Sequence, residues 1–211
     1  MVALPAFRER IVQQPDEALN GLELTARERQ RLLAIAAQPG MRVNTAIHRA
    51  NRLAPLDQTV PLTCFLLGDR LPEVLERYWF ENPTENLQLP AECERFAAFL
   101  KKEIRANRVA DAYVEEVLAF EQACIQLRFL TRHELEAVNP LAEGLPDQIR
   151  IVEFRHDPVR LLEALTNLQS PPDDLTAGEF HLLIDYRSDD PVFRLIDREG
   201  LAAIRGLVNR D

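Results

Sequence analysis

The chain has 211 residues, 46% of them hydrophobic, which is enough for one domain or two small domains with a sizeable core. Its formal net charge of −9 disfavours DNA or RNA as a partner, because nucleic-acid binders present basic surfaces to phosphates. No apolar run approaches the ~20 residues that span a bilayer, and the first residues turn polar too early for a signal peptide. We therefore expect a cytoplasmic protein that does not enter a membrane.

The N-terminal half has the periodicity of successive amphipathic helices. In the segment 25–37, Thr25 and Glu28 have the spacing of a capping box, in which each side chain accepts a hydrogen bond from the other residue's backbone N–H. Pro39 and Gly40 are expected to end this helix. Helical spacing of apolar residues also predicts helices over 4–14, 43–54, 60–69, 70–82, 91–104 and 109–128.

The pattern changes after residue 130. The β-branched run 149–155 predicts a strand, and Asp157 and Pro158 are suited to the N-cap and first position of a helix that follows it. The segment 180–197, FHLLIDYRSDDPVFRLID, alternates apolar and polar residues on both sides of a turn sequence, which predicts a β-hairpin. The chain then closes with a helix, the segment DREGLAAIRGLV.

These elements predict a mainly α protein with two domains. Residues 1–138 form a helical domain, and residues 145–211 form a small α+β domain with a β-hairpin, similar in layout to a winged helix or a peptide-recognition element. Two prolines lie between the domains, at 139–148, as expected of a boundary.

The cysteines and histidines have no spacing typical of a metal or redox site. We expect the cysteines to be buried small hydrophobic residues. The seven glycines are dispersed, so no phosphate-binding loop is predicted, and no Gly-x-Ser-x-Gly motif occurs. The sequence therefore predicts a protein that is not an enzyme and has no cofactor; an enzyme with a bound metal remains an alternative. The cysteines and histidines without such a spacing are Cys64, Cys93, Cys124, His48, His133, His156 and His181.

The helix 43–54 presents a cluster of polar residues before Pro55, which is expected to end or kink it. One interpretation is a solvated polar face. The other is a surface that docks a partner protein, because arginine pairs with carboxylates and stacks on aromatic rings at interfaces. The predicted docking residues are His48, Arg49, Asn51 and Arg52.

Two further features call for burial. The aromatic run Tyr78-Trp79-Phe80 is expected to pack in the core rather than to recognise a ligand. Glu121 has apolar neighbours on both sides, and a buried carboxylate needs a partner, for which Arg49 or Arg52 is the candidate.

The α+β domain offers a candidate peptide site. A small sheet beside a helix can leave an edge strand unpaired, and an extended peptide can add to such an edge as another strand. The alternative is a domain that only covers an apolar face of the helical domain. The predicted peptide-binding residues, on the hairpin and the last helix, are Leu182, Leu183, Ile184, Asp185, Tyr186, Arg187, Leu201, Ile204 and Arg205.

Five segments together resemble the HvfC/BufC-type family over most of residues 43–211. They are HRANRLAPLDQTVPLTCFLLGDRLPEVLERYWFENP, ERFAAFLKKE, YVEEVLAFEQACIQL, RIVEFRHDPVRLLEAL and FHLLIDYRSDDPVFRLIDREGLAAI. Members of this family have been catalogued as DNA-binding domains. They are also partners of iron-dependent enzymes that modify cysteine residues in ribosomally made peptides.

The resemblance implies a non-catalytic adaptor. Such a protein would bind the leader of a short ribosomal precursor peptide and dock it to a metal-dependent, iron-containing peptide-modifying enzyme. The alternative is a nucleic-acid-binding transcriptional regulator with a winged-helix-like C-terminal domain, whose last helix would offer Arg198, Arg205 and Arg210 to DNA. The acidic net charge favours the adaptor.

Overall fold

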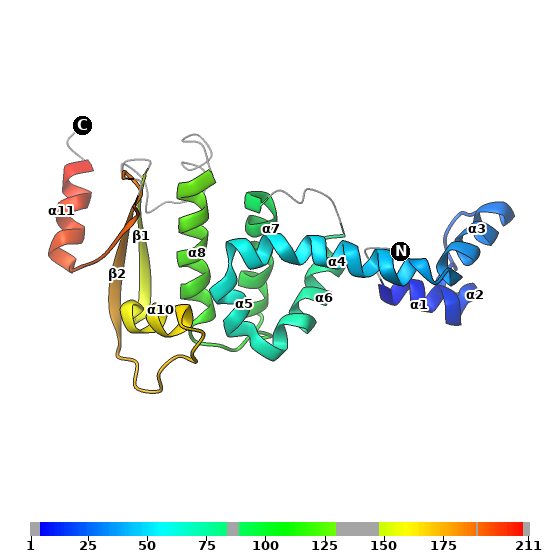
Figure 1. Ribbon diagram of the computed structural model, residues 1–211, viewed down its shortest axis with the longest axis horizontal. Helices are drawn as coiled ribbons and strands as arrows, with labels where there is room; N and C mark the ends of the chain where they lie inside the picture. Colours follow the sequence, from blue (N-terminus) through cyan, green and yellow to red (C-terminus); the bar gives the residue numbers. More distant parts are fainter. Residues whose placement is uncertain (1–4, 84–88, 130–147, 189, 209–211) are drawn as a thin grey trace. The chain divides into compact units, whose positions relative to one another are not determined.

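The computed structural model describes residues 5–83, 89–129, 148–188 and 190–208, and side chains from 7 to 204 within those ranges (Figure 1). The chain is mainly helical, and its described part carries a small three-stranded antiparallel sheet near the C-terminus. This confirms the predicted fold class of a helical part followed by a small α+β part.

The chain forms two compact units. Their bounds are Met1–Pro55 with Arg70–Leu87 for the first unit and Leu56–Asp69 with Gln88–Asp211 for the second. The sequence-based domains were 1–138 and 145–211, so the structure places several of the predicted N-terminal helices in the same unit as the sheet.

The described part of the first unit contains helices alone. They are α1 (Pro5–Gln13), α2 (Pro15–Ala18), α3 (Ala26–Ala37), most of α4 (Gly40–Thr59) and α6 (Leu71–Glu81). The predicted capping box begins α3: the Glu28 N–H donates to Thr25 Oγ1 at 3.2 Å, and the Thr25 N–H donates to Glu28 Oε2 at 2.8 Å. Ile11, Leu19 and Ala36 are buried in a small core between α1, α2 and α3.

Helix α4 does not end at Pro55, which was one of the two predicted outcomes, an end or a kink. It continues to Thr59 with the proline inside it. A proline in a helix loses one backbone hydrogen bond and clashes with the preceding turn. The continuation is stabilised by burial, because Leu56 and Val60, just after the proline, have no exposed surface.

The second unit combines helices with the sheet. Its elements are α5 (Pro61–Leu67), a 3-10 turn η1 (Gly68–Arg70) shared with the first unit, α7 (Leu89–Arg105), α8 (Val114–Phe129), β1 (Ile149–His156), α10 (Pro158–Thr166), β2 (Ala177–Asp185), β3 (Val192–Ile196) and α11 (Arg198–Val208). As predicted, Asp157 caps α10, because its Oδ1 accepts a hydrogen bond from the Val159 N–H at 2.9 Å. Gly68 ends α5 with a φ of 48°, a backbone angle that favours glycine.

Helix α8 begins at Val114, later than the predicted start at residue 109. Asn107 has a φ of 55°, which stops helical geometry after α7. The Asp111 side chain then accepts a hydrogen bond from the Tyr113 N–H at 2.9 Å and forms a turn before α8. The aspartate competes with the helix for backbone donors, which the apolar periodicity alone did not show.

The core of the second unit lies between one face of the sheet and the helices α8 and α10. Val152 and Phe154 of β1 and Leu182 and Ile184 of β2 are buried there, together with Leu161 of α10. Figure 1 shows α8 lying alongside β1. The period of two in the strands places these residues on the same face of the sheet.

Candidate functional site

β2 is the central strand of the sheet. The strand order is β1-β2-β3, and Leu182 is opposite Val152 of β1 and Leu195 of β3. The backbone N–H and C=O groups of β2 are therefore used on both sides. We predicted that a peptide adds along residues 182–187 of the hairpin. For the part of that stretch that lies in β2 the prediction is wrong, because a strand with two neighbours cannot pair with a third.

β3 leaves its outer edge open within the described residues. The Tyr186 N–H donates to the Gln148 carbonyl at 2.8 Å, so the even-numbered residues of β2 face β1 and the odd-numbered ones face β3. The β3 residues opposite the odd-numbered ones are Val192, Arg194 and Ile196. By alternation, the N–H and C=O groups of Phe193 and Leu195 point away from the sheet.

β3 also exposes apolar side chains on both of its faces. The exposed fractions are 42% for Val192, 47% for Phe193 and 43% for Leu195. The ring of Phe193 lies 5.8 Å from that of Phe120, and this contact holds the strand against α8. An edge with unpaired backbone groups and exposed apolar side chains is the kind to which an extended peptide can add.

The predicted peptide-binding residues of the hairpin differ in exposure. Leu182 and Ile184 belong to the core, so their side chains cannot contact a ligand. Leu183 and Tyr186 are half-buried. Arg187 is exposed and donates from Nη2 to Asp185 Oδ2 at 2.6 Å, and its guanidinium lowers the pKa of Asp185.

Helix α11 follows β3 directly and contacts it. Its start is capped by Asp197, whose Oδ1 accepts a hydrogen bond from the Gly200 N–H at 2.7 Å. Arg198 pairs with Glu179 of β2, and this contact lowers the pKa of Glu179. Leu201 is buried and Ile204 is half-buried, whereas the side chain of Arg205 lies outside the described residues.

Arg52, one of the predicted docking residues, is buried in the first unit. It is 1% exposed, its Nη1 donates to the Asn82 carbonyl at 2.7 Å, and its guanidinium lies 5.1 Å from the centre of the Tyr78 ring. Arg52 therefore links α4 to the end of α6 and cannot contact a partner through its side chain. Asn51 is exposed, and His48 is half-buried.

Arg49 is half-buried on the same helix. It pairs with Glu76 of α6, and its guanidinium lies 5.6 Å from the ring centre of Trp79. Tyr78 and Trp79 are buried, as predicted for a core aromatic run, but Phe80 is 71% exposed. Phe80 lies on a different face of α6 from the buried Tyr78 and Trp79, because three consecutive residues of a helix cannot share one face.

Glu121 is buried, as expected, but its partners are backbone groups and not an arginine. Its carboxylate accepts hydrogen bonds from the Leu62 N–H at 2.7 Å and the Thr63 N–H at 2.9 Å. These are two of the unpaired donors at the start of α5. Burial raises the pKa of Glu121 to about 7, while the donors of Thr63 and Leu62 act in the opposite direction.

The three cysteines have no disulfide or metal role in the described part of the chain. Cys64 and Cys93 are buried and Cys124 is half-buried, close to the prediction. Burial raises the pKa of each thiol to about 12, which makes it a poor nucleophile. Among the described residues, no group of three or more His, Cys, Asp or Glu side chains is placed to hold a metal ion.

Glu116 links α8 to β1, and the sequence analysis missed it. It is 4% exposed, its Oε2 accepts a hydrogen bond from the Arg155 N–H at 2.6 Å, and its Oε1 lies 2.7 Å from His156 Nδ1. The sequence feature that could have predicted its burial is its place as the second glutamate in the first turn of α8, beside the apolar residues Val117 and Phe120. One carboxylate thereby occupies the end of the outer edge of β1.

No protein-family model matches this chain, and a search of curated proteins finds no match. Within the described residues, no helix is long and apolar enough to cross a membrane. The candidate site therefore rests on its own geometry, which is the open edge of β3 beside α11.

Proposed function

We propose that the chain is a non-catalytic adaptor that binds a short ribosomal precursor peptide as an added strand on the outer edge of β3. The observation that supports this proposal is that Phe193 and Leu195 have backbone groups unpaired by any described residue, on a strand with exposed apolar side chains. The backbone of the peptide would supply the hydrogen bonds, and its alternate side chains would pack on the two faces of β3. Leu201 and Ile204, two of the predicted peptide-binding residues, lie on α11, the helix that follows β3 in the chain.

The partner half of the proposal rests on the sequence resemblance. In this proposal the adaptor presents the peptide to an iron-dependent enzyme that modifies it, in the cytoplasm, where precursor peptides are made. The exposed residues of α4, including Asn51, and the exposed Phe80 are candidates for the surface that meets the enzyme. The net charge of −9 suits a basic or neutral leader peptide.

Nothing in the described residues favours the nucleic-acid alternative. Of the arginines in the last helix and tail, Arg198 is engaged with Glu179. Arg205 and Arg210 have no described side chains. Binding of duplex DNA remains an outcome that the experiment below would detect as a failure of the adaptor proposal.

The test uses a random 12-residue peptide library panned on the full chain, followed by fluorescence anisotropy with the enriched peptides. Leu195→Pro removes the outward N–H and should weaken binding about tenfold relative to Leu195→Ala, which keeps it. Glu153→Pro is the matched change at the β1 edge and should bind with the same affinity as Glu153→Ala, which removes the same side chain but keeps the outward N–H.

Each contrary outcome has a definite meaning. Loss of binding in Glu153→Pro alone would place the peptide on β1 and refute the β3 site. Equal affinities for all four variants would show that no strand is added. A chain that enriches no peptide and binds duplex DNA with a steep salt dependence would support the regulator instead.

A further inference from the structure

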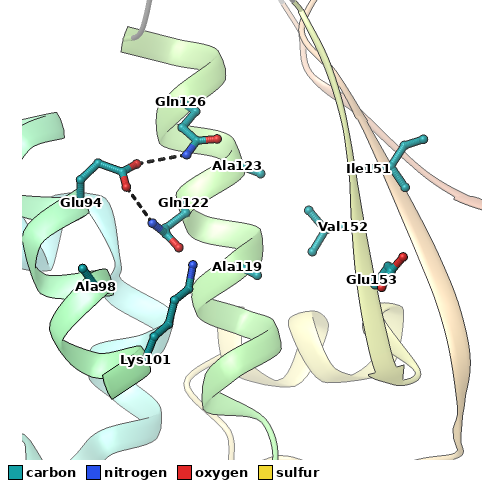
Figure 2. Close-up of a pocket in the computed structure, with 10 residues that line it drawn as sticks. All are labelled: Glu94, Ala98, Lys101, Ala119, Gln122, Ala123, Gln126, Ile151, Val152 and Glu153. Atoms are coloured by element: carbon teal, nitrogen blue, oxygen red, sulfur yellow. Dashed lines mark hydrogen bonds between the residues drawn. The ribbon is translucent and has the colours of Figure 1, made fainter. Parts of the chain in front are cut away.

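A cavity of about 380 Å³ lies at the other edge of the sheet, between α7, α8 and β1 (Figure 2). This volume can hold the end of a long side chain or a small ligand. All of its walls belong to the second unit. The lining residues are Glu94, Ala98 and Lys101 of α7, Ala119, Gln122, Ala123 and Gln126 of α8, and Ile151, Val152 and Glu153 of β1.

Glu94 orients two buried glutamines in this cavity. Gln122 Nε2 donates to Glu94 Oε2 at 3.0 Å, and Gln126 Nε2 donates to Glu94 Oε1 at 3.1 Å. Because a carboxylate can only accept, both amide nitrogens must face Glu94 and both amide oxygens must turn away from it. Figure 2 shows the two oxygens pointing away from the carboxylate.

The two amide oxygens are acceptors without a donor. Gln122 is 7% exposed and Gln126 is 5% exposed. Among the described residues neither oxygen has a hydrogen-bond partner, and neither is completely sealed from solvent. A polar atom held in a nearly buried side chain is costly unless a ligand or water pairs with it.

β1 adds backbone acceptors along the same wall. The Arg155 N–H points away from β2, since it donates to Glu116, and the Gln148 carbonyl points toward β2. By alternation, Ile151 and Glu153 direct both their C=O and their N–H groups away from β2, at the stretch of β1 that lines the cavity, so their carbonyls can accept a hydrogen bond from a ligand there. Small residues at Ala98, Ala119 and Ala123 leave room beside them.

The charges of the lining favour a cation. Two carboxylates, Glu94 and Glu153, line the cavity with one ammonium group, Lys101. Lys101 has no ion-pair partner among the described residues, so it does not neutralise Glu94 directly. An anionic ligand would meet two like charges and several acceptors, whereas a cation with several N–H groups can pair with them.

We propose that this cavity binds a guanidinium or ammonium group carried on a flexible alkyl chain. The planar guanidinium suits this lining best, because it offers five N–H donors in a fixed fork to a set made of carboxylates and amide oxygens. The group is either an arginine side chain of a bound polypeptide or a free amine of the agmatine type. The proposal does not depend on a peptide at β3, because it concerns the opposite edge of the sheet.

The experiment titrates three probes into the full chain by isothermal calorimetry. N-acetyl-arginine methylamide represents the polypeptide source, agmatine represents the free amine, and N-acetyl-citrulline methylamide is the neutral isostere. The side-chain amide NMR signals of Gln122 and Gln126 report whether the cavity is the site. A cationic probe should saturate and shift these signals, and the citrulline compound should do neither.

Two variants, one that removes a negative charge from the cavity and one that removes a positive charge, distinguish binding in the cavity from general attraction to an acidic protein. Glu94→Gln should weaken the binding of the cationic probe about tenfold, and Lys101→Ala should strengthen it several-fold by removing a like charge. Glu163→Gln, on the exposed face of α10, removes the same charge elsewhere and should change the affinity little. If Glu94→Gln does not fold, Glu153→Gln replaces it.

Tighter binding of the arginine compound supports the polypeptide source, and tighter binding of agmatine supports the free amine. Three outcomes overturn the proposal. One is no saturation by either cation up to about 10 mM, a concentration that corresponds to a negligible affinity. The others are equal losses in Glu94→Gln and Glu163→Gln, and weaker binding of the cationic probe in Lys101→Ala, because an ammonium group beside the site should oppose a bound cation.

Discussion

The two edges of the sheet are built differently. β1 is eight residues long, its first four residues are buried, and Glu116 of α8 pairs with a backbone donor on its outer side. β3 is five residues long, and its first four residues are exposed. Both strands pair with β2 in antiparallel fashion; the β2–β3 register is regular, whereas the β1–β2 register shifts between Phe154 and His156.

The difference shows how a small sheet can cover one edge with its own packing and leave the other open among the described residues. Unpaired edges promote aggregation unless they are covered, shortened or charged. β1 is covered by α8 along part of its length. β3 is short and carries one charged residue, Arg194, so its edge is limited in length but not closed.

The largest expected contrast between the edges concerns their phenylalanines. Phe154 of β1 is 2% exposed, and Phe154→Ala should lower the free energy of unfolding by about 3–5 kcal/mol. Phe193 of β3 is 47% exposed, and Phe193→Ala should cost about 1 kcal/mol. Urea unfolding followed by circular dichroism measures both. Equal losses would contradict the view that β3 adds little to the core.

The next largest effect depends on pH and acts on α8, the helix that covers β1. Burial raises the pKa of Glu121 from 4.5 to about 7, so the folded state holds a proton that the unfolded state releases between these values. The free energy of unfolding should therefore fall as the pH rises from about 4.5 to 7, by on the order of 3 kcal/mol.

Glu121→Gln supplies the control for this pH dependence. The glutamine cannot ionise, so the fall in stability over the same pH range should become smaller by the Glu121 contribution. Urea unfolding of both proteins at several pH values gives the comparison. An unchanged slope in Glu121→Gln would mean that another group causes it.

A smaller effect is expected at the covered edge itself. Glu116→Ala leaves the Arg155 N–H without its acceptor at a part-buried position and should cost about 1–3 kcal/mol. The matched control is Glu115→Ala, which breaks an exposed pair with the Arg155 side chain and should cost about 0–1 kcal/mol. Amide hydrogen exchange of Arg155 should also become faster in Glu116→Ala alone. Equal effects of the two variants would show that β1 does not need its covering carboxylate.

Local chemistry explains what the sequence predicted correctly. The capping box of Thr25 and Glu28 and the N-cap at Asp157 depend on residues two or three positions apart, and both form as expected. The hairpin of β2 and β3 follows from alternation around a turn. Such signals lie within one segment, so the rest of the fold is not needed to read them.

Long-range pairing explains what the sequence did not predict. Alternation shows that residues 181–185 form a strand, but only the arrival of β1 on the other side makes this strand central. The burial of Arg52 depends on Asn82, thirty positions away, and the acceptors of the cavity depend on Glu94 meeting Gln122 and Gln126. The spacing of the two glutamines by four residues within an apolar helix was a usable signal for the last of these.

The raised pKa values of Cys64, Cys93 and Cys124 have a consequence for thiol exchange. With a pKa of about 12, only about one thiol in 100,000 is a thiolate at pH 7, against a few per cent for an ordinary cysteine. A mixed disulfide forms by attack of a thiolate. If the proposed adaptor role is right, a cysteine-containing peptide bound to this protein would meet almost no competing thiolate at these three positions.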